Sequence, residues 1–342
     1  MKYLSFVVPS YNSEKYLNKC IDSLLIGKED VEIIIVNDGS IDNTLKIANE
    51  YKEKYPSIVK VIDKENGGHG SGVNAGLKVA TGLYFKVVDS DDWVDESSYL
   101  KLLNQIKEHY NNNTLVDLYF TNYVFERLDL NKSHTENFIK KRFPNNKVFT
   151  WNEVKAFMPY EFILMHMVVF KLDVLKKCEM ELPEHCFYVD SCFAYKPLRY
   201  VNTMYYMDVD FYRYYVGRPD QSVTFSNMTK RYHMQLLVTK TMLGYYSYDE
   251  IKSLPRKQFK FLKHELAMKL YLALFYVYID LNKEKLEAYK EYWNDIKIKD
   301  KKMYRKLRFG SVFTVSELLI RPMKRIAVKI GYKILTKKTL WN

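Results

Sequence analysis

The sequence predicts an α/β fold, in which a doubly wound and mostly parallel sheet is followed by a helical C-terminal region. Short runs that are apolar throughout alternate with segments of helical spacing over the first 120 residues. Strands without a polar face suit a sheet that helices cover on both sides. Polar, glycine-rich or acidic segments follow these runs, and open α/β sheets bind ligands beyond the carboxyl ends of their strands. We therefore expect the chemistry at one edge of this sheet.

The expected strands are the apolar runs at 4–9, 31–36, 59–62, 84–88 and 116–121. The helices between them are expected at 13–25, 42–54, 70–80 and 96–109. A helix between two strands returns the chain to the edge where the first strand began, so the strands run parallel. Beyond residue 121 the pattern is less regular. It indicates mixed short elements, an alternating aromatic strand pair at 203–217, and helical periodicity over 229–293.

The length of 342 residues exceeds the usual size of one domain, so we expect a main domain with additions. The α/β domain is expected at 1–225, with its first half at 1–120 and its second at 121–225. A helical subdomain at 226–296 and a basic tail at 297–342 follow. The tail holds 14 basic and 2 acidic residues, so its formal charge of +12 equals that of the whole chain.

The tail contains an amphipathic pattern. On a helix, one face would carry the apolar residues Met323, Ile326, Ala327, Ile330 and Ile334, with basic residues opposite. A basic amphipathic helix fits a peripheral contact with an anionic membrane, and its apolar face fits equally well a contact between copies of the chain in a homo-oligomer. Both alternatives stay open. We expect no nucleic acid as a partner, because no recognisable nucleic-acid module accompanies the charge.

The cysteine pattern favours a reducing compartment. The four cysteines form no CxxC pair and no metal-finger spacing, so we expect reduced thiols rather than disulfides or a structural zinc. The N-terminal segment lacks the apolar core of a signal peptide, and the apolar run at 266–279 is shorter than the ~20 residues that span a bilayer. We expect a cytoplasmic protein, with the inner face of the cell membrane as the place of any peripheral contact.

The segment KVVDSDDW, residues 86–93, gathers three carboxylates within four residues at the end of an apolar run. Two unit charges about 4 Å apart repel by roughly 4 kcal/mol at a surface dielectric, so this cluster needs solvent or a cation. Asp89 and Asp91 offer the hard oxygen ligands that Mg²⁺ and Mn²⁺ prefer. The alternative is a solvated acidic turn in which Asp92 caps the following helix.

Two further segments lie at the expected edge. ENGGHGSGVNAG, residues 65–76, fails the GxGxxG dinucleotide pattern because its third glycine is displaced by one position. Its glycines still allow a helix amino terminus to approach an anion closely, although a permissive loop without a ligand is the alternative. In NDGSIDNT, we expect Asp38 to bond a base or sugar rather than only shape a turn, and Asp42 to cap a helix.

Four ordered segments carry a resemblance to a known family: PSYNSEKYL, VNDGSIDNT, NGGHGSGVNAGLKVATGLYFKVV and DSDDW. In this order and spacing they resemble the family 2 glycosyltransferases with the glycosyltransferase A fold, densely over 3–125 and more thinly up to 225. The resemblance implies inverting transfer of a sugar from a nucleotide-sugar, usually UDP-linked, to a hydroxyl acceptor, assisted by Mn²⁺ or Mg²⁺. The first half of the domain would bind the donor and the second the acceptor, a surface glycan, teichoic acid or lipid-linked precursor.

The resemblance also assigns roles to residues at matching positions of this chain. It gives the nucleoside pocket to Pro9, Tyr11 and Asn12, the base to Asp38, the nucleotide to Asn66, Gly67 and Gly68, the ribose or metal to Asp89, and the metal to Asp91. Many members carry an Arg-Asn pair where this chain has Val73-Asn74. We count Lys86 among the donor-binding candidates because it, or His69, could replace that arginine.

The second half supplies the candidates for catalysis. An inverting transfer needs a base for the acceptor hydroxyl, and the resemblance assigns it to Asp190 in CFYVDSCFAY, where Val189 replaces a glutamate common in the family. A helix cap is the alternative for Asp190. Arg218, in RYYVGRPDQSVT, would counter the charge of the donor diphosphate or form a surface ion pair. His166 would line the acceptor site or be a satisfied core histidine.

Two functions from other classes stay open at this point. A non-catalytic nucleotide-sugar-binding or scaffold protein would have a damaged base or metal site, and a nucleotidyltransferase on a similar sheet would release pyrophosphate rather than a nucleoside diphosphate. The presence of both Asp91 and Asp190 favours a metal-dependent hexosyl-type glycosyltransferase.

Overall fold

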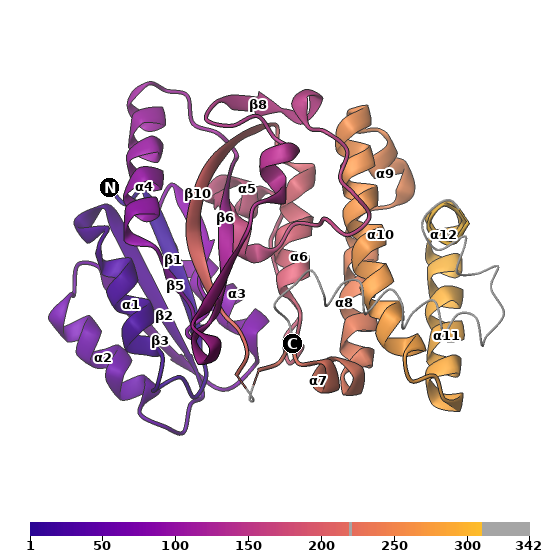
Figure 1. Cartoon of the computed structure of the whole chain (residues 1–342), viewed down its shortest axis with the longest axis horizontal. Helices are drawn as coiled ribbons and strands as arrows, with labels where there is room; N and C mark the ends of the chain where they lie inside the picture. The colour runs from indigo at the N-terminus through magenta and orange to yellow at the C-terminus, as the bar shows by residue number, and fades with distance from the viewer. Residues whose placement is uncertain (219–220, 310–342) are drawn as a thin grey trace. The chain divides into compact units, whose positions relative to one another are not determined.

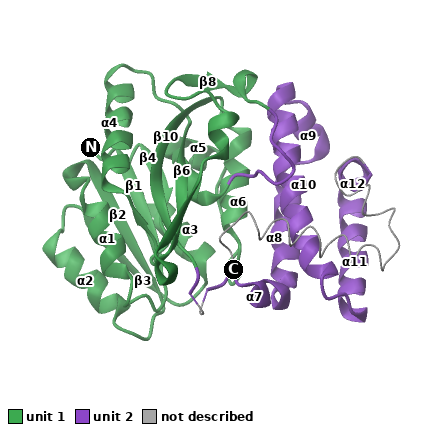
Figure 2. Cartoon of the chain, in the orientation of Figure 1, with its two compact units in different colours: residues 1–155, 164–216 green, residues 156–163, 217–342 purple. Residues whose placement is uncertain are grey.

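The structure is a computed structural model that describes residues 1–218 and 221–309 (Figure 1). The chain divides into two compact units, the first made of 1–155 and 164–216 and the second of 156–163 and 217–342 (Figure 2). The division thus lies at 216 rather than at the expected 225, and a short segment from the α/β part belongs with the helical part. The amphipathic pattern expected near the C-terminus lies outside the described residues.

The first unit is built on one mixed sheet. Its strands are β1 (Leu4–Ser10), β2 (Val31–Asp38), β3 (Val59–Lys64), β4 (Tyr84–Val87), β5 (Trp93–Val94), β6 (Leu118–Arg127), β7 (Lys132–Glu136), β8 (Val148–Thr150), β9 (Val168–Lys171) and β10 (Thr203–Tyr215). Their order is β3-β2-β1-β4-β9-β6-β10-β5, with β7 on β6 and β8 on β10. The first four strands are parallel as expected, but β9 runs antiparallel between β4 and β6. The sheet is therefore more mixed than the sequence suggested.

The first four helices of the first unit lie within a few residues of the segments that the periodicity predicted, and two short helices follow that it did not predict. They are α1 (Leu17–Leu25), α2 (Thr44–Lys54), α3 (His69–Val79), α4 (Glu96–Asn111), α5 (Leu172–Lys177) and α6 (Asp190–Tyr195). The first begins later than residue 13 because the carbonyl of Ser13 accepts the amides of Tyr16 and Leu17 in a turn. Short 3₁₀ turns join several of these elements, and one of them, Met165–Met167, leads directly into β9.

Helices cover both faces of the sheet at β1. The ring of Phe6 packs edge-on against Tyr99 of α4, with centroids 5.3 Å apart. The neighbouring Val7 faces α3, where a Cβ on Gly76 would lie 2.4 Å from its side chain. Successive side chains of a strand point to opposite faces, so α3 and α4 lie on opposite sides (Figure 1). Close packing of α3 on β1 fixes where the amino terminus of that helix lies.

The aromatic segment near residue 210 forms one strand, not the expected pair. β10 runs for 13 residues parallel to β6. Its sequence, TMYYMDVDFYRYY, contains no glycine, proline or asparagine to make a hairpin turn. Instead, the register against β6 shifts on either side of Asp210. A shift of this kind re-aims the side chains that follow it, among them Tyr212 and Tyr214.

The second unit is helical, as its periodicity indicated. Its described helices are α7 (Phe225–Lys230), α8 (Tyr232–Tyr245), α9 (Tyr248–Lys252), α10 (Arg256–Tyr278), α11 (Lys283–Lys299) and α12 (Lys301–Arg308). The boundary expected at 296 falls inside α11. Segment 156–163 is bonded to α10, where Glu265 accepts the amide of Ile163 and His264 bonds the carbonyl of Glu161. Across the described ranges, none of the helices has the length and apolar character needed to cross a membrane.

Candidate functional site

The loops that follow β1, β2 and β4 meet at the carboxyl edge of the sheet, as the sequence predicted. The side-chain oxygen of Asn12 accepts the backbone amide of Ile41 at 2.9 Å, and the backbone amide of Asn12 donates to the hydroxyl of Ser40 at 3.0 Å. The hydroxyls of Ser13 and Ser90 lie 2.6 Å apart. Side chains of three loops that are distant in sequence therefore hold one another in place.

The nucleoside-pocket candidates lie at the start of this edge. Pro9 is buried at the end of β1, beyond the last residue of that strand that pairs with β4, so its missing amide leaves no gap in that ladder. Tyr11 is 53% exposed and Asn12 has a left-handed backbone, with φ at 49°. Their contact with a nucleoside stays a prediction.

Asp38 organises the glycine-rich segment. Its carboxylate, only 3% exposed, accepts the amides of Gly67 and Gly68 at 2.9 and 2.7 Å and the ammonium of Lys64 at 2.9 Å. Its carbonyl accepts the side-chain amide of Asn66 at 2.9 Å. Gly68 has φ at +82°, which only glycine adopts readily, and it begins α3. Asp38 thus aims the amino terminus of α3, and its contact with a base stays a prediction.

The same glycine-rich segment anchors the loop that leads to Asp190. Asn74 of α3 exchanges two hydrogen bonds with the backbone of Leu182, at 2.9 and 2.8 Å. A Cβ on Gly70 would lie 2.2 Å from the carbonyl oxygen of Pro183, so only glycine permits this approach. Helix α3 and the loop of Asp190 are therefore packed as one body. The sequence marked the glycines and Asn74 but not this partner.

Asp190 is the first residue of α6 and lies near the donor-side groups. The preceding Val189 occupies the cap position, so the expected alternative of a capping aspartate is wrong. Burial alone would lower the pKa of His69, but the charges of Asp89 first and then Asp190 raise it above its ordinary value. The base candidate and the metal-ligand candidate therefore act on one imidazole.

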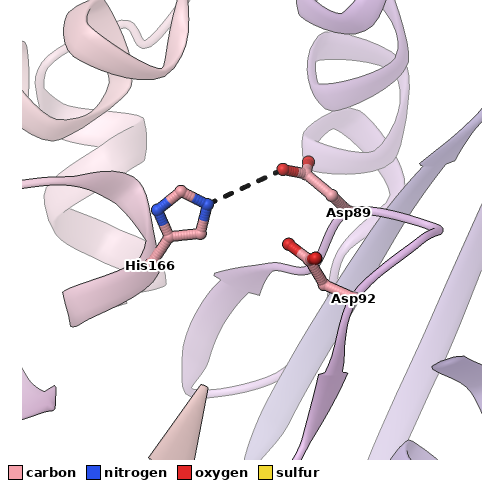
Figure 3. Close-up of side chains that lie close together, drawn as sticks. All are labelled: Asp89, Asp92 and His166. Atoms are coloured by element: carbon pink, nitrogen blue, oxygen red, sulfur yellow. Dashed lines mark ion pairs between the residues drawn. The ribbon is translucent and has the colours of Figure 1, made fainter. Parts of the chain in front are cut away.

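Asp89 lies between two histidines. Its Oδ1 accepts a hydrogen bond from Nε2 of His69 at 2.8 Å, and its Oδ2 lies 3.8 Å from Nε2 of His166 (Figure 3). Burial alone would raise the pKa of Asp89, but the two imidazoles outweigh it and hold that pKa well below its usual range. Asp89 is therefore held as an anion at the end of β4.

Asp92 is a structural carboxylate. It is 1% exposed, and its two oxygens accept the hydroxyl of Tyr212 at 2.7 Å and the amide of Tyr215 at 2.8 Å. Burial and the nearby charge of Asp89 raise its pKa well above the ordinary value. It does not cap the following helix, because Asp95 does so by accepting the amide of Ser98.

Asp91 is partly buried on the turn between these two carboxylates. The group whose ligand atoms lie within 4.8 Å of one another consists of Asp89, Asp92 and His166 among the described residues, and it does not include Asp91. This spacing of oxygen and imidazole donors fits a divalent cation. The part of Asp91 in holding it stays a prediction.

Lys86 is not a donor ligand, and that expectation is wrong. Its side chain is fully buried, and the ammonium donates to the carbonyls of Met165 and His166 at 2.8 Å each and of Val168 at 3.2 Å. An ammonium has three donors, so none is left for a diphosphate. Burial lowers its pKa to about 7. Lys86 instead ties β4 to the turn that precedes β9.

His166 is not the satisfied core histidine that we considered. It is 5% exposed, and neither ring nitrogen has a hydrogen-bond partner. Its ring stacks on Tyr214 with centroids 4.4 Å apart and meets Tyr212 edge-on at 4.6 Å. A histidine within the apolar run ILMHMVVF was the only signal in the sequence. It faces Asp89, which lies 77 positions earlier in the chain.

Arg218 belongs to the second unit. The segment around it is folded by Gln221, whose side-chain oxygen accepts the amides of Gly217 and Arg218 at 2.7 and 3.2 Å. The role of Arg218 toward a donor diphosphate stays a prediction.

Comparisons with known proteins identify the family of the first unit. The sequence model of glycosyl transferase family 2 matches residues 5–171. A poly(ribitol-phosphate) beta-glucosyltransferase of Bacillus spizizenii is 43% identical over 117 residues, 33% of this chain and 18% of that protein. A putative glycosyltransferase of Bacillus subtilis, EpsH, is 29% identical over 68% of this chain and 64% of its own length. The chain thus spans less than two thirds of the length of these relatives.

The fold has a counterpart among solved structures. Residues 1–349 of S. aureus TarS, solved in complex with UDP-GlcNAc, superpose with a TM-score of 0.67 at 20% identity, covering 97% of this chain and 92% of that one. The mixed sheet and the helices that follow it are therefore those of a glycosyltransferase A fold. By the match of its sequence, the segment of residues 5–171 belongs to glycosyl transferase family 2.

Proposed function

We propose that the protein is an inverting glycosyltransferase that moves a sugar from a UDP-sugar to a hydroxyl of a bacterial cell-surface glycan or teichoic acid. The family, the named activity of the Bacillus spizizenii relative and the UDP-GlcNAc complex of TarS support this class of reaction. The single observation that carries the proposal is convergence on helix α3. His69, its first residue, bonds Asp89 at 2.8 Å, and Asn74 and Gly70 of the same helix hold the loop that leads to Asp190.

On the donor side, Asp38 fixes the loop of Gly67 and Gly68, so that the amino terminus of α3 presents its amides and positive dipole to the diphosphate. Pro9, Tyr11, Asn12 and Asn66 would surround the nucleoside. Asp91, with Asp89, would hold Mn²⁺ or Mg²⁺, which supplies positive charge to the departing diphosphate.

On the acceptor side, Asp190 accepts the proton of the acceptor hydroxyl. The freed oxygen attacks the anomeric carbon from the side opposite the diphosphate, and the bond to the diphosphate breaks with inversion. Asn74 and Gly70 hold the loop of Asp190 against α3, so base and donor keep a fixed geometry. Such positioning accounts for much of the rate of enzymatic transfers.

We further propose a peripheral contact with the inner face of an anionic membrane. In α12, Lys301, Lys302, Arg305 and Lys306 are exposed, and the apolar side chains of Ile298 and Phe309 beside them are 76% and 57% exposed. Basic residues near an anionic surface gain about 1 kcal/mol each. Co-sedimentation with phosphatidylserine vesicles, weakened by salt, tests it; self-association without vesicle binding would favour the homo-oligomer instead.

The function is tested in two steps. Calorimetry with a panel of nucleotide-sugars, with and without Mn²⁺, identifies the donor. With that donor and a poly(ribitol phosphate) acceptor, release of a nucleoside diphosphate is then measured for the wild type and for Asp190→Asn. We expect the variant to bind the donor normally and to lose transfer at least about 100-fold, because it lacks the base.

Asp173→Asn is the matched control, since Asp173 is an aspartate of the same unit with a side chain that is 77% exposed. Its transfer rate should equal that of the wild type. Release of pyrophosphate would indicate a nucleotidyltransferase, and donor binding without turnover in the wild type would indicate a scaffold. Normal transfer by Asp190→Asn would contradict the assignment of the base.

A further inference from the structure

We propose that His166 is a direct ligand of the divalent cation, together with Asp89, and that it makes the site prefer Mn²⁺ to Mg²⁺. This inference rests on the proposed function, because the cation serves the donor diphosphate. It goes beyond the pair Asp89 and Asp91 by adding a nitrogen ligand that comes from the turn before β9.

The first argument is the unpaired imidazole. More than nine tenths of the side chain of His166 is buried, yet neither ring nitrogen has a hydrogen-bond partner, and Asp89 faces Nε2 only at 3.8 Å. Buried polar side chains are hydrogen-bonded in the large majority of cases, because a buried polar group without a hydrogen bond destabilises the fold. The exception needs a partner that the protein itself does not provide.

The second argument is a distance. Nε2 of His166 lies 3.8 Å from Oδ2 of Asp89, too far for a hydrogen bond. Ligands in neighbouring positions around one ion, each about 2.1 Å from it, are separated by roughly 3.0 Å in an octahedral site and roughly 3.4 Å in a tetrahedral one. A shift of less than about 1 Å would therefore let one ion bridge these two atoms. The remaining oxygen of Asp89 is engaged by His69, so the carboxylate is turned with Oδ2 toward His166 (Figure 3).

The third argument is that the ring is fixed in this direction. Tyr214 stacks on one face of the imidazole and Tyr212 meets it edge-on. The carbonyl of His166 is held by the buried ammonium of Lys86 at 2.8 Å. A ligand held in place before the metal arrives loses little conformational freedom on binding. Lys86, which does not contact a donor, thus acts on the site by positioning His166.

The fourth argument concerns the choice of metal. Mg²⁺ prefers oxygen ligands and keeps several waters, whereas imidazole suits the transition metals. A site with one imidazole and one or two carboxylates therefore gains affinity for Mn²⁺ that it does not gain for Mg²⁺. A site made of Asp89 and Asp91 alone has only oxygen ligands and would lack this additional affinity for Mn²⁺.

The test uses the full chain with Mn²⁺ alone and with Mn²⁺ plus UDP. Bound Mn²⁺ is followed by electron paramagnetic resonance, and pulsed measurements detect the coupling of its electron spin to a ligand ¹⁴N nucleus. We expect this coupling in the wild type and its loss in His166→Gln. Mn²⁺ affinity should fall at least about tenfold in that variant, while Mg²⁺ affinity changes less than about threefold.

Two histidine variants serve as controls. His134→Gln changes an exposed histidine of β7 and should leave coupling and affinity unchanged. His69→Gln should retain the nitrogen coupling, because His69 bonds Asp89 and is not itself a ligand. Loss of the coupling in His69→Gln with its survival in His166→Gln would overturn the proposal.

Further outcomes separate this proposal from the proposed function. Bound Mn²⁺ without nitrogen coupling in the wild type would overturn the role of His166, which would then be an ion-pair partner of Asp89, and would leave the Asp89–Asp91 site intact. Nitrogen-coupled Mn²⁺ that persists in Asp91→Asn would support His166 and remove Asp91 from the metal site. Because the decisive spectrum is that of the wild type, a His166 variant that fails to fold does not remove the test.

Discussion

Glu32 and Asp89 are carboxylates at opposite edges of the same sheet, and their surroundings differ: Glu32 is buried, whereas the side chain of Asp89 is 26% exposed. Glu32 begins β2 and is 1% exposed. It accepts the hydroxyl of Ser5, the ammonium of Lys60 and the amides of Thr81 and Gly82, at 2.5 to 3.2 Å. Four donors from three segments leave this carboxylate satisfied, so its role is structural.

The carboxylate of Asp89, beyond the end of β4, accepts a hydrogen bond from His69. The imidazole of His166, which has no hydrogen-bond partner, faces its other oxygen at 3.8 Å. Glu265 of α10, in the helical unit, shows a third outcome. Its carboxylate accepts the amide of Ile163, and burial raises its pKa to about 8. Carboxylates inside the protein are thus stabilised by donors at Glu32 and by a proton at Glu265, and we propose a cation for Asp89. A carboxylate with too few hydrogen-bond donors indicates a cation site only where the carboxylate stays ionised, because a protonated carboxyl group needs no cation.

The largest expected effect is at the satisfied carboxylate. Glu32→Ala leaves a hydroxyl, two amides and the ammonium of Lys60 without their acceptor, and each unpaired buried group costs about 1–3 kcal/mol. We expect the free energy of unfolding of the first unit to fall by about 4 kcal/mol, measured by urea denaturation. Mn²⁺ affinity of the folded variant should stay within about threefold of the wild type, because the site lies at the other edge.

Glu50→Ala removes an exposed glutamate of α2 and is the control for this variant. Its free energy of unfolding should change by less than about 0.5 kcal/mol. If folded Glu32→Ala lost Mn²⁺ binding, the two edges would be coupled and the comparison would fail.

An intermediate effect is expected at Lys86. Its ammonium has all three of its hydrogen bonds, although it lies only three positions before Asp89 in the chain. Lys86→Met keeps the length of the side chain but leaves the carbonyls of Met165, His166 and Val168 without a donor. The cost of burying the ammonium disappears at the same time, so we expect a net loss of about 2 kcal/mol in the free energy of unfolding.

Calorimetry decides between this structural role and the role first expected for Lys86. A residue that binds the diphosphate would lower donor affinity by more than about tenfold when replaced. We expect a change of less than about threefold for Lys86→Met in the presence of saturating Mn²⁺. A larger loss of donor affinity would restore Lys86 to the donor site.

The effect expected at Glu265 depends on pH, and at pH 4 it is the smallest of the three. Burial raises the pKa of Glu265 to about 8, against the opposing effects of Lys269 and the amide of Ile163. The folded protein therefore holds a proton that the unfolded chain releases above its ordinary pKa of 4.5. The stabilisation is complete below that pKa and is lost as the pH rises through 8.

Glu265→Gln cannot ionise, so its stability should not follow this loss. We expect variant and wild type to be equally stable at pH 4 and the variant to be more stable by about 4 kcal/mol at pH 9. Urea denaturation at both pH values, followed by helical circular dichroism, measures the difference. Parallel behaviour of the two proteins across this range would show that Glu265 is ionised in the fold.

The parts of the fold that could be predicted from the sequence depend on local signals. Apolar runs and helical periodicity placed β1 to β4 and their helices, and the polar residues that follow them placed the edge. The irregular parts depend on distant pairing. The pairing of β9 with β4 brings the turn of His166 close to Asp89, and no local pattern in the sequence predicts that contact.

The errors at individual residues have the same origin. Lys86 lies in an apolar strand, and its structural role needs three carbonyls from a turn about 80 residues away. The strand pair expected near residue 210 is one strand, because the irregularity around Asp210 occurs without a turn residue. The local pattern can predict in which strand or loop a charged residue lies. Whether that residue is free to bind a ligand depends on its hydrogen-bond partners, which come from distant parts of the chain.

The approach of Gly70 to the carbonyl of Pro183 has a consequence for engineering. Exchange of the 181–190 loop between glycosyltransferases is an obvious way to change the acceptor. In this protein a transplanted loop would pack against α3. There Gly70 leaves room for the carbonyl of Pro183, and Asn74 bonds the backbone of Leu182. The unit of exchange is therefore the loop together with residues 66–79, and a chimera that moves one without the other should misplace residue 190, the proposed base.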